Sequence, residues 1–350
     1  MGSHRIIKPH RVTLKDVAKA SGLSLSTVSN ALAGHPSVRK ATREKTIEVA
    51  NDMGYRISSL ARGLRTGKTG TIGFLVSDIT VPYYPQVVRG IEDILLPHGY
   101  FLWIGNSDYD ATKEQNYINH FLDRQVEGIF LSPYSIYSEN VRHVREAGIP
   151  LVLLNRKHDS LSNDLVGVDY QGDTLVGLHY LWDLGHRKIG VLLATMDSSI
   201  TRDRLAAIAA FLRQKNVSES TIVTQTFGHY TTAESGRDAT RKLLANHSDV
   251  TAIFGADNVA VGALSALLEM GLNVPRDISV LGFDGLAPFD LPQISLSTMS
   301  VSQRELGRVA AELMLERISA PSDVIKTFML RSTLVVRGTT APPHLQTLAS

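Results

Sequence analysis

The sequence contains no cysteine, which excludes a thiol nucleophile, a disulfide framework and a metal site built on thiolates. It has no long uninterrupted apolar run and no secretory signal segment, so nothing in it predicts a membrane span or export. The patterns G-x-x-x-x-G-K-[ST], G-x-G-x-x-G, H-E-x-x-H and G-x-S-x-G are also missing. These absences argue against an enzyme, and we expect no catalytic residue, no metal and no cofactor. His186 is interpreted as a surface residue that precedes a strand.

A net charge of +2 conceals a strong division of charge along the chain. Residues 1–68 hold 13 Lys and Arg against 4 Asp and Glu, whereas the rest of the chain holds 23 against 30. A basic module joined to an acidic body is expected where one end of a protein meets a phosphate backbone. The basic segment is therefore the first place to look for a nucleic-acid-binding motif.

The stretch T-L-K-D-V-A-K-A-S-G-L-S-L-S-T-V-S-N in this segment predicts two short helices around a turn. Thr13, three residues before Asp16, is typical of a capping box, so the first helix begins directly after Thr13. Gly22 ends it. Ser24 is placed to cap a second helix over 25–32. The arrangement predicts a helix-turn-helix, and an ordinary helical hairpin is the alternative for this stretch taken alone.

The second helix would present short, uncharged side chains outward, as expected for a helix that lies in the major groove of DNA. The DNA-binding candidates of this module are Thr13, Leu25, Ser26, Thr27, Ser29 and Asn30. A third helix is expected over 40–53, with Ile47, Ala50 and Met53 as its inner stripe. Three short helices make a minimal core, which is marginal when it stands alone.

From Thr71 onward, short apolar runs alternate with helical stretches, which predicts parallel sheets covered by helices. This part of the chain exceeds one comfortable core, so two lobes with a cleft between them are expected. The runs expected as strands are T-I-G-F-L-V, F-L-W-I, G-I-F-L, L-V-L-L, I-G-V-L-L, A-I-F-G and S-V-L-G-F. We expect the chain to cross between lobes near Asp169, near 297–299 and around 322–328.

The segment I-S-S-L-A-R-G-L-R-T-G-K-T joins the two parts. With this segment, the chain resembles the LacI/GalR family of bacterial transcription regulators. The stretches L-G-H-R-K-I-G, M-G-L-N-V-P-R-D-I-S-V-L-G-F-D and L-S-T-M-S-V-S-Q-R-E-L-G add to the resemblance. It implies an α/β fold, with a small all-α helix-turn-helix domain followed by a two-lobed periplasmic-binding-protein-like domain. It also implies a hinge that becomes helical on DNA, with Leu64 wedged into the minor groove.

The resemblance and the composition together predict the domain boundaries. They are a DNA-binding domain at 1–57, a hinge at 58–69, an effector-binding domain at 70–340 and a tail at 341–350. Within the effector-binding domain, the first lobe is expected at about 70–168 and 300–325, and the second at about 169–299 and 326–340.

Ligands of open α/β sheets bind beyond the carboxyl ends of the strands, so the polar and aromatic residues that follow each apolar run are the effector-binding candidates. They are Tyr83, Tyr84, Asp169, Ser198, Arg204, Tyr230, Asp257 and Asp284. The resemblance implies that Arg204 and Asp284 hold the polar end of the effector. An ion pair between them is the structural alternative.

Two positions depart from the family pattern. Asn155 stands where the family often has Asp, and Ala256 where it often has Asn. The effector is therefore left open as sugar-like, carboxylated, aromatic or nucleoside-like. The resemblance implies a cytoplasmic, nucleoid-associated homodimer on near-palindromic operator DNA, with no membrane partner. The alternative is a small-molecule-binding protein whose N-terminal module recognises no specific operator.

Overall fold

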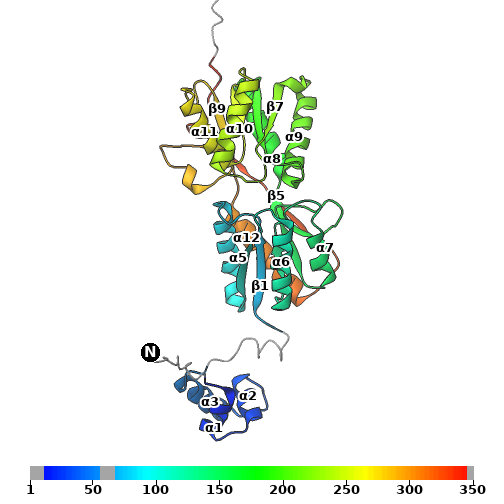
Figure 1. The fold of residues 1–350 in the computed structure, drawn as a ribbon, viewed down its shortest axis with the longest axis vertical. Helices are drawn as coiled ribbons and strands as arrows, with labels where there is room; N and C mark the ends of the chain where they lie inside the picture. Colours follow the sequence, from blue (N-terminus) through cyan, green and yellow to red (C-terminus); the bar gives the residue numbers. More distant parts are fainter. Residues whose placement is uncertain (1–11, 56–67, 345–350) are drawn as a thin grey trace, which may run out of the picture. The chain divides into compact units, whose positions relative to one another are not determined.

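The structure is a computed structural model that describes residues 12–55 and 68–344. The chain forms two compact units that divide between Thr69 and Gly70 (Figure 1). Leu64 and nearly all of the expected hinge lie outside the described residues. None of the described helices is long and apolar enough to cross a membrane.

The first unit has the three helices that the sequence predicts: α1 (Leu14–Ser21), α2 (Leu25–Leu32) and α3 (Lys40–Asp52). The capping box is confirmed, because the backbone N–H of Thr13 donates to Asp16 Oδ2 at 2.8 Å and the N–H of Asp16 donates to Thr13 Oγ1 at 3.4 Å. Gly22 ends α1 with φ of 67°. Ser24 caps α2 by accepting the N–H of Thr27 at 3.1 Å. The turn is therefore set by local hydrogen bonds.

The core of the first unit is small and apolar, with Val17, Val28 and Ala50 fully or almost fully buried. The predicted inner stripe of α3 is wrong at Ile47, which is 41% exposed. Thr46 takes the inward position instead, and its hydroxyl donates to the carbonyl of Thr42 at 2.7 Å. A hydroxyl satisfied within its own helix can be buried at little cost, so hydrophobicity alone misidentified the buried face.

The second unit contains two six-stranded sheets. Across the first sheet the order is β11 (Thr327–Leu330), β5 (Asp164–Val168), β4 (Leu151–Leu154), β3 (Ile129–Leu131), β1 (Thr71–Val76) and β2 (Phe101–Asn106). Across the second it is β12 (Thr333–Val335), β10 (Ser297–Ser300), β9 (Ser279–Asp284), β8 (Ala252–Phe254), β6 (Ile189–Leu193) and β7 (Ile222–Thr226). All pairings are parallel except that of β12 with β10. The expected two-lobed α/β architecture is thus confirmed.

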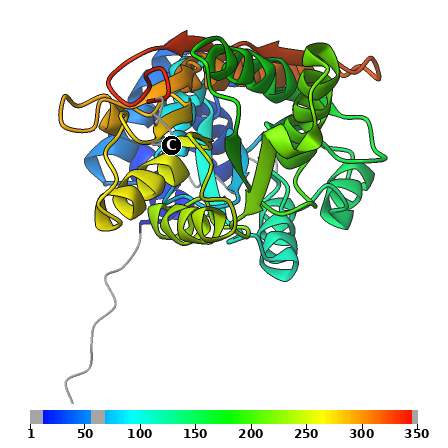
Figure 2. The same cartoon turned by 90° about the horizontal axis from the view of Figure 1, so that it is seen from above.

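Helices cover both faces of each sheet (Figures 1 and 2). In the first lobe, α5 (Tyr83–Leu95) packs on α12 (Gln303–Ser319), and α6 (Ala111–Asp123) packs on α7 (Glu139–Glu146). In the second lobe, α8 (Tyr170–Asp183) packs on α9 (Ser199–Lys215), and α10 (Ala233–Asn246) packs on α11 (Asp257–Glu269). Short 3₁₀ turns lie at Leu96–His98, Glu219–Thr221 and Ala287–Phe289.

Glycines allow two of these helix pairs to approach closely. A Cβ on Gly90 of α5 would lie 2.0 Å from the carbonyl oxygen of Arg304 in α12. A Cβ on Gly262 of α11 would lie 2.0 Å from the carbonyl oxygen of Ala233 in α10. Both crossings therefore require a residue without a side chain.

The chain crosses between lobes after β5, after β10 and after β11. The first two crossings agree with the predictions near Asp169 and 297–299. The third lies between Leu330 and Thr333 rather than around 322–328, because Thr327–Leu330 pairs with β5 of the first lobe. The four residues of β11 are largely exposed, so the sequence carries no strong buried-strand pattern there.

The C-terminal segment is more closely attached than a tail. The carbonyl of Ala341 accepts a hydrogen bond from Ser279 Oγ and pairs with His186 Nε2, both at 3.0 Å. His186 is fully buried and its Nδ1 lies 2.9 Å from Thr251 Oγ1, so its interpretation as a surface residue is wrong. Burial lowers the pKa of His186 and so favours its neutral form, while the hydrogen bond to the carbonyl of Ala341 opposes this shift.

Candidate DNA-recognition helix and ligand cavity

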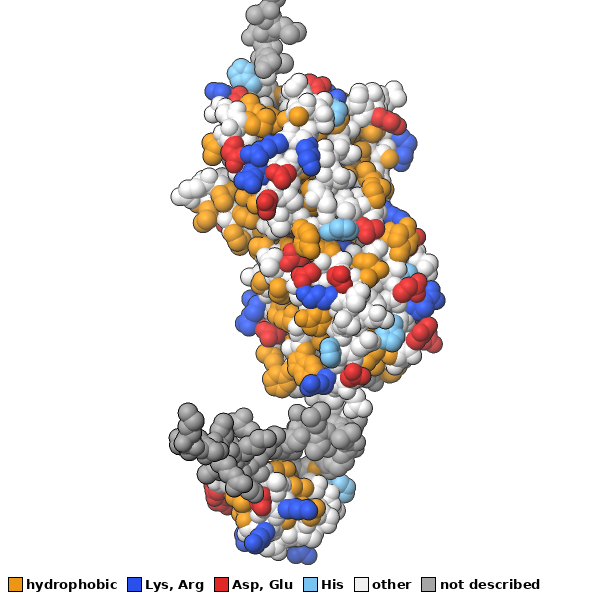
Figure 3. Space-filling model, in the orientation of Figure 1, with side chains coloured by type: hydrophobic (Ala, Val, Ile, Leu, Met, Phe, Trp, Pro, Cys, Tyr) orange, Lys and Arg blue, Asp and Glu red, His pale blue; other side chains and the backbone are white. Residues whose placement is uncertain are grey.

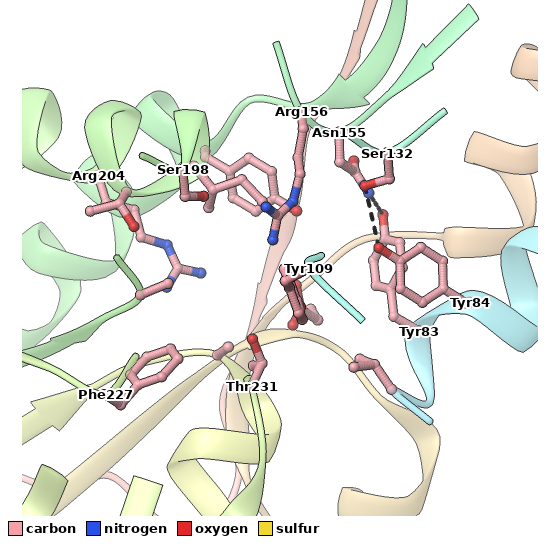
Figure 4. A pocket seen from close by; sticks show the side chains of 17 residues that line it. Tyr83, Tyr84, Tyr109, Ser132, Asn155, Arg156, Ser198, Arg204, Phe227 and Thr231 are labelled. Atoms are coloured by element: carbon pink, nitrogen blue, oxygen red, sulfur yellow. Dashed lines mark hydrogen bonds between the residues drawn. The ribbon is translucent and has the colours of Figure 1, made fainter. Parts of the chain in front are cut away.

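A cavity of about 90 Å³ lies between the two lobes, at the carboxyl ends of both sheets. A buried water needs only about 10–15 Å³, so the cavity has room for a small metabolite. The lining residues come from both lobes and are Val81, Tyr83, Tyr84, Tyr109, Ser132, Asn155, Arg156, Tyr170, Ala194, Ser198, Ile200, Thr201, Arg204, Phe227, Thr231, Ala256 and Asp284. Figure 4 shows many of these side chains pointing toward one space.

Five of the eight effector-binding candidates line this cavity: Tyr83, Tyr84, Ser198, Arg204 and Asp284. Each was placed by the rule that ligands bind beyond strand ends. Tyr83 and Tyr84 begin α5, Arg204 is on α9, and Asp284 ends β9.

Asp169 and Asp257 do not line the cavity, and each has a structural role instead. Asp169 caps α8 by accepting the N–H of Gly172 at 3.0 Å. Asp257 is fully buried and accepts from the N–H of Leu286 and from the hydroxyl of Thr298, both at 2.7 Å. Asp257 thus holds the loop that follows β9, next to the cavity rather than in it.

Tyr230 also lies outside the cavity lining and is 50% exposed. Its ring meets Tyr109 edge-on, with centroids 5.4 Å apart, and its hydroxyl donates to the carbonyl of Asp108 at 3.3 Å. Tyr230 therefore joins the two lobes at the rim.

Arg204 and Asp284 face the same space without forming an ion pair. Arg204 is 6% exposed and its Nε has no hydrogen-bond partner among the described residues. Its guanidinium rests on the rings of Phe283 and Tyr170, at 4.7 and 5.7 Å from their centroids. A buried cation with unused donors is costly unless another molecule pairs with it, so the arrangement favours a bound ligand.

Asp284 lies in an environment that disfavours its charge. Burial raises the pKa of this carboxyl, Asp257 raises it further, and Arg204 opposes the shift. Burial likewise raises the pKa of Asp257 to about 6, against the effect of its hydrogen bonds from Leu286 and Thr298. Burial also lowers the pKa of Arg204, and the field of Asp284 opposes that shift. The cavity floor is therefore a strained electrostatic arrangement, typical of a functional site.

The first lobe supplies a wall of hydroxyl and amide groups. Asn155 Nδ2 donates to the hydroxyl of Tyr83 at 2.9 Å, and the hydroxyl of Tyr84 donates to Ser132 Oγ at 3.3 Å; Figure 4 marks both bonds. Asn155 Oδ1 is buried and has no hydrogen-bond partner within the described part of the chain. Burial raises the pKa of Tyr83, so it stays a neutral donor.

Tyr109 and Arg156 project into the middle of the cavity (Figure 4). The Arg156 guanidinium lies over the Tyr109 ring, 5.1 Å from its centroid. The candidate list missed both residues, and also Ser132, Tyr170 and Thr231. These residues follow short or weakly patterned strands or begin a helix, so only their closeness to the other lining residues in space identifies them as part of the cavity.

Three lining residues have backbone angles that L-residues rarely adopt. The φ angles of Tyr109, Asn155 and Asp284 are 57°, 60° and 114°. Such conformations cost of order 1–3 kcal/mol each and are found where function over-determines the backbone. Their position around one cavity supports its assignment as a binding site.

Contacts across the rim join the lobes. Lys157 Nζ pairs with Asp203 Oδ2 at 2.7 Å, and Arg202 Nη1 pairs with Asp159 Oδ1 at 2.6 Å. Arg202 also bonds the hydroxyl of Tyr137. The lobes are therefore closed on each other in this structure.

In the first unit, α2 presents much of the predicted recognition surface. Leu25 is 44% exposed and Ser26 is exposed, while Ser29 and Asn30 are half-buried. Thr27 Oγ1 lies 2.8 Å from Ser24 Oγ within the cap. Figure 3 shows Lys and Arg side chains on the surface of this unit. The hydroxyl of Thr13 is bonded to Asp16 at 2.7 Å, which leaves it a capping role.

Comparison with known proteins follows the same division of the chain. The family model for bacterial regulatory proteins of the lacI family matches residues 13–58, and that for a periplasmic binding protein-like domain matches residues 178–340. Catabolite control protein A of Priestia megaterium is 32% identical over 87% of this chain and 91% of its own. The ribose operon repressor of Haemophilus influenzae is 30% identical over 93% and 97%.

Solved structures agree. The lac repressor dimer bound to operator and the anti-inducer ONPF superposes with a TM-score of 0.83, at 26% identity, over 95% of this chain and 100% of that one. The helix-turn-helix, the two-lobed domain and the identity to full-length regulators together establish that the chain belongs to the lacI family of bacterial transcriptional regulators, which bind DNA.

Proposed function

We propose that the protein is a transcriptional repressor that binds a near-palindromic operator as a homodimer, and that a small effector in the inter-lobe cavity controls its affinity for DNA. The observation that carries the effector role is the cavity itself, where buried Arg204 and half-buried Asp284 line the same space without an ion pair between them. The relatives named above include repressors and an operator complex, which supports the DNA-binding role.

On the DNA side, we assign base recognition to the exposed face of α2. Leu25 and Ser26 lie at its N-terminal end, where side chains reach base edges in the major groove. Ser29 and Asn30 follow one turn later. Thr13 and Thr27 act through the helix caps, with any phosphate contact secondary to that role.

On the effector side, ligand binding between the lobes would stabilise one relative lobe position and thereby alter the operator affinity of the dimer. A hundredfold change in operator affinity requires the effector to bind one state more tightly by roughly 2.7 kcal/mol. Whether the effector releases DNA or promotes binding depends on which state it prefers.

For dimerisation we propose the edge of the first sheet. β2 is the last strand in the order of that sheet, and it exposes Phe101 (64%), Trp103 (40%) and Ile104 (45%). An apolar edge strand is an aggregation hazard unless a partner covers it. A second copy of the chain is the partner that a palindromic operator requires.

The proposals on localisation and on catalysis follow from the family, whose members regulate transcription. We propose that the chain acts in the cytoplasm, at the nucleoid, and that bound ligand is released without chemical change.

The test is selection of random duplex DNA on the purified protein at about 0.15 M salt, with and without a pool of small metabolites. A palindromic motif whose recovery changes with the pool is the expected result. The variant Leu25→Ala/Ser26→Ala/Asn30→Ala should change the preferred bases, whereas Lys15→Ala should only weaken the salt dependence. A motif unchanged in the triple variant would refute the assignment of α2, and no motif at all would refute operator recognition.

A further inference from the structure

The charges that line the cavity identify the class of molecule it suits. Apart from the tyrosines, three of the lining residues have ionisable side chains: Arg156, Arg204 and Asp284. Burial favours the neutral form of Asp284. The cavity is therefore positively charged overall, which favours an anionic ligand.

Arg156 marks one end of that charge. Among the described residues its side chain makes one hydrogen bond, a long one from Nη1 to the carbonyl of Tyr134 at 3.4 Å, and no ion pair. Glu114 lies behind it, but the oxygens of Glu114 already accept from the Tyr134 N–H, Ser138 Oγ and Asn140 Nδ2. The guanidinium donors that face the cavity are thus available to a ligand.

The neighbours of Arg156 strengthen this interpretation. Asn155, next to it in the chain, contributes a neutral amide to the first-lobe wall, beside the hydroxyls of Tyr83, Tyr84 and Ser132. No carboxylate of the first lobe lines the cavity. A guanidinium surrounded by hydroxyl and amide groups, with no acidic neighbour in the lining, is a binding environment for a carboxylate or a phosphate.

The other end of the cavity suits hydroxyl groups. A ligand hydroxyl placed between Arg204 and Asp284 can accept from the guanidinium and donate to the carboxyl oxygen, and so satisfies both. Ser198 Oγ is buried and has no hydrogen-bond partner in residues 12–55 and 68–344, so it can bond a further hydroxyl. A series of hydroxyls, rather than a second anionic group, matches this end.

Guanidinium groups cover two of the aromatic rings that line the cavity, those of Tyr109 and Tyr170. One face of Tyr109 is covered by Arg156. Tyr170 stacks on Phe283 with centroids 5.3 Å apart, and Arg204 lies over both rings. A purine or pyrimidine that stacked on Tyr109 or Tyr170 would compete with these guanidinium groups for the ring face, which disfavours a base at these two rings.

We propose that the effector is a small polyhydroxylated anion, a sugar acid or a sugar phosphate, with its anionic group on Arg156 and its hydroxyls between Arg204 and Asp284. This inference rests on the proposed function of the cavity as the effector site. It makes Arg156 the residue that distinguishes charged from neutral sugars.

The test is calorimetric titration of the full-length protein with matched compounds. The probes are D-glucose, D-gluconate and D-glucose 6-phosphate; D-galactose and D-galacturonate; D-ribose and D-ribose 5-phosphate; adenosine and cytidine; and inorganic phosphate. We expect one acid or sugar phosphate to bind at least tenfold more tightly than its neutral parent, a difference of about 1.4 kcal/mol. Arg156→Gln should reduce that preference to about twofold, and Arg156→Lys should keep part of it.

Arg187→Gln is the matched control, because Arg187 also stacks on an aromatic ring, that of Trp182 at 3.9 Å, but does not line the cavity. It should leave the preference unchanged. Binding of a neutral sugar or a nucleoside as tight as that of the acids, failure of every anionic compound to bind, or an unchanged preference in Arg156→Gln would overturn the inference.

A second variant separates this inference from the function on which it rests. Arg204→Ala should abolish binding of whichever compound binds. If a neutral compound binds and Arg204→Ala abolishes its binding, the cavity is the effector site and only the anionic class is wrong. If binding survives in Arg204→Ala, the cavity is not the effector site, and the proposed function fails.

Discussion

Replacing Arg204 by methionine separates the binding role of this residue from any structural role. Methionine keeps an unbranched side chain, which matches the aliphatic part of arginine, and removes the cation. Arg204 is 6% exposed, its Nε has no hydrogen-bond partner among the residues that the structure describes, and its guanidinium rests on the rings of Phe283 and Tyr170. Ring contacts of this kind contribute about 0.5–2 kcal/mol to the stability of the fold, whereas burying an unpaired cation costs several kcal/mol. We expect the free energy of unfolding to be unchanged or higher in Arg204→Met.

Ligand affinity should change in the opposite direction. A hydrogen bond from a charged donor contributes about 1.5–3 kcal/mol, so its loss should weaken effector binding roughly 10- to 150-fold. The assay combines urea denaturation of the ligand-free protein with calorimetric titration of the effector. Operator affinity without effector should stay at the wild-type value, because the substitution leaves the DNA-binding unit intact.

Arg187→Met is the control, since it removes a stacked arginine from the surface without touching the cavity. It should leave effector affinity at the wild-type value. A fall of about 3 kcal/mol or more in the unfolding free energy of Arg204→Met is what a broken buried ion pair would cause. That result, or an effector affinity equal to that of the wild type, would refute the argument that the hydrogen-bond donors of Arg204 serve to bind a ligand.

Three further outcomes are expected. Asp203→Asn removes the inter-lobe ion pair with Lys157, which is partly exposed and so contributes about 0.2–1 kcal/mol to the closure of the lobes. Effector affinity measured by calorimetry should therefore fall by up to about fivefold, and an unchanged affinity would count against a closed binding state. Burial raises the pKa of Asp284, so the stability of the wild-type protein falls as the pH rises above about 4, the pKa of this carboxyl in the unfolded chain. The Tm of Asp284→Asn should therefore exceed that of the wild type by an amount that grows from about pH 5 to about pH 8. A Tm difference that stays constant with pH would contradict the predicted direction of the pKa shift. Trp103→Glu should shift the protein toward monomer in sedimentation velocity runs, and an intact dimer would move the interface away from β2.

Local patterns in the sequence predicted where the first two helices of the first unit begin. Thr13, Asp16 and Ser24 set the helix starts by hydrogen bonds over three residues, so the boundaries of α1 and α2 could be predicted directly. Prediction failed at Ile47, where a satisfied threonine hydroxyl is buried in its place. Burial depends on which helix face meets the others, and a single helix does not encode that choice uniquely.

In the candidate site, too, the sequence predicted some residues correctly and others wrongly. Arg204 and Asp284 could be found because each follows an apolar strand, and the rule about strand ends applies to both. The same rule wrongly selected Asp257, whose oxygens are used by Leu286 and Thr298. Position after a strand indicates nearness to the cleft, but not whether the side chain points into it.

The sequence alone determined the family, the division into a basic helical module and a two-lobed α/β body, and the helix boundaries of the first unit. These follow from periodicity, caps and the distribution of charge. Only the tertiary structure decided that β11 belongs to the first lobe, that His186 is buried, and that Arg156 and Tyr109 share a cavity with Arg204. Those facts depend on contacts between residues far apart in the chain. Strand pairing and lobe closure create them, and no local pattern records them.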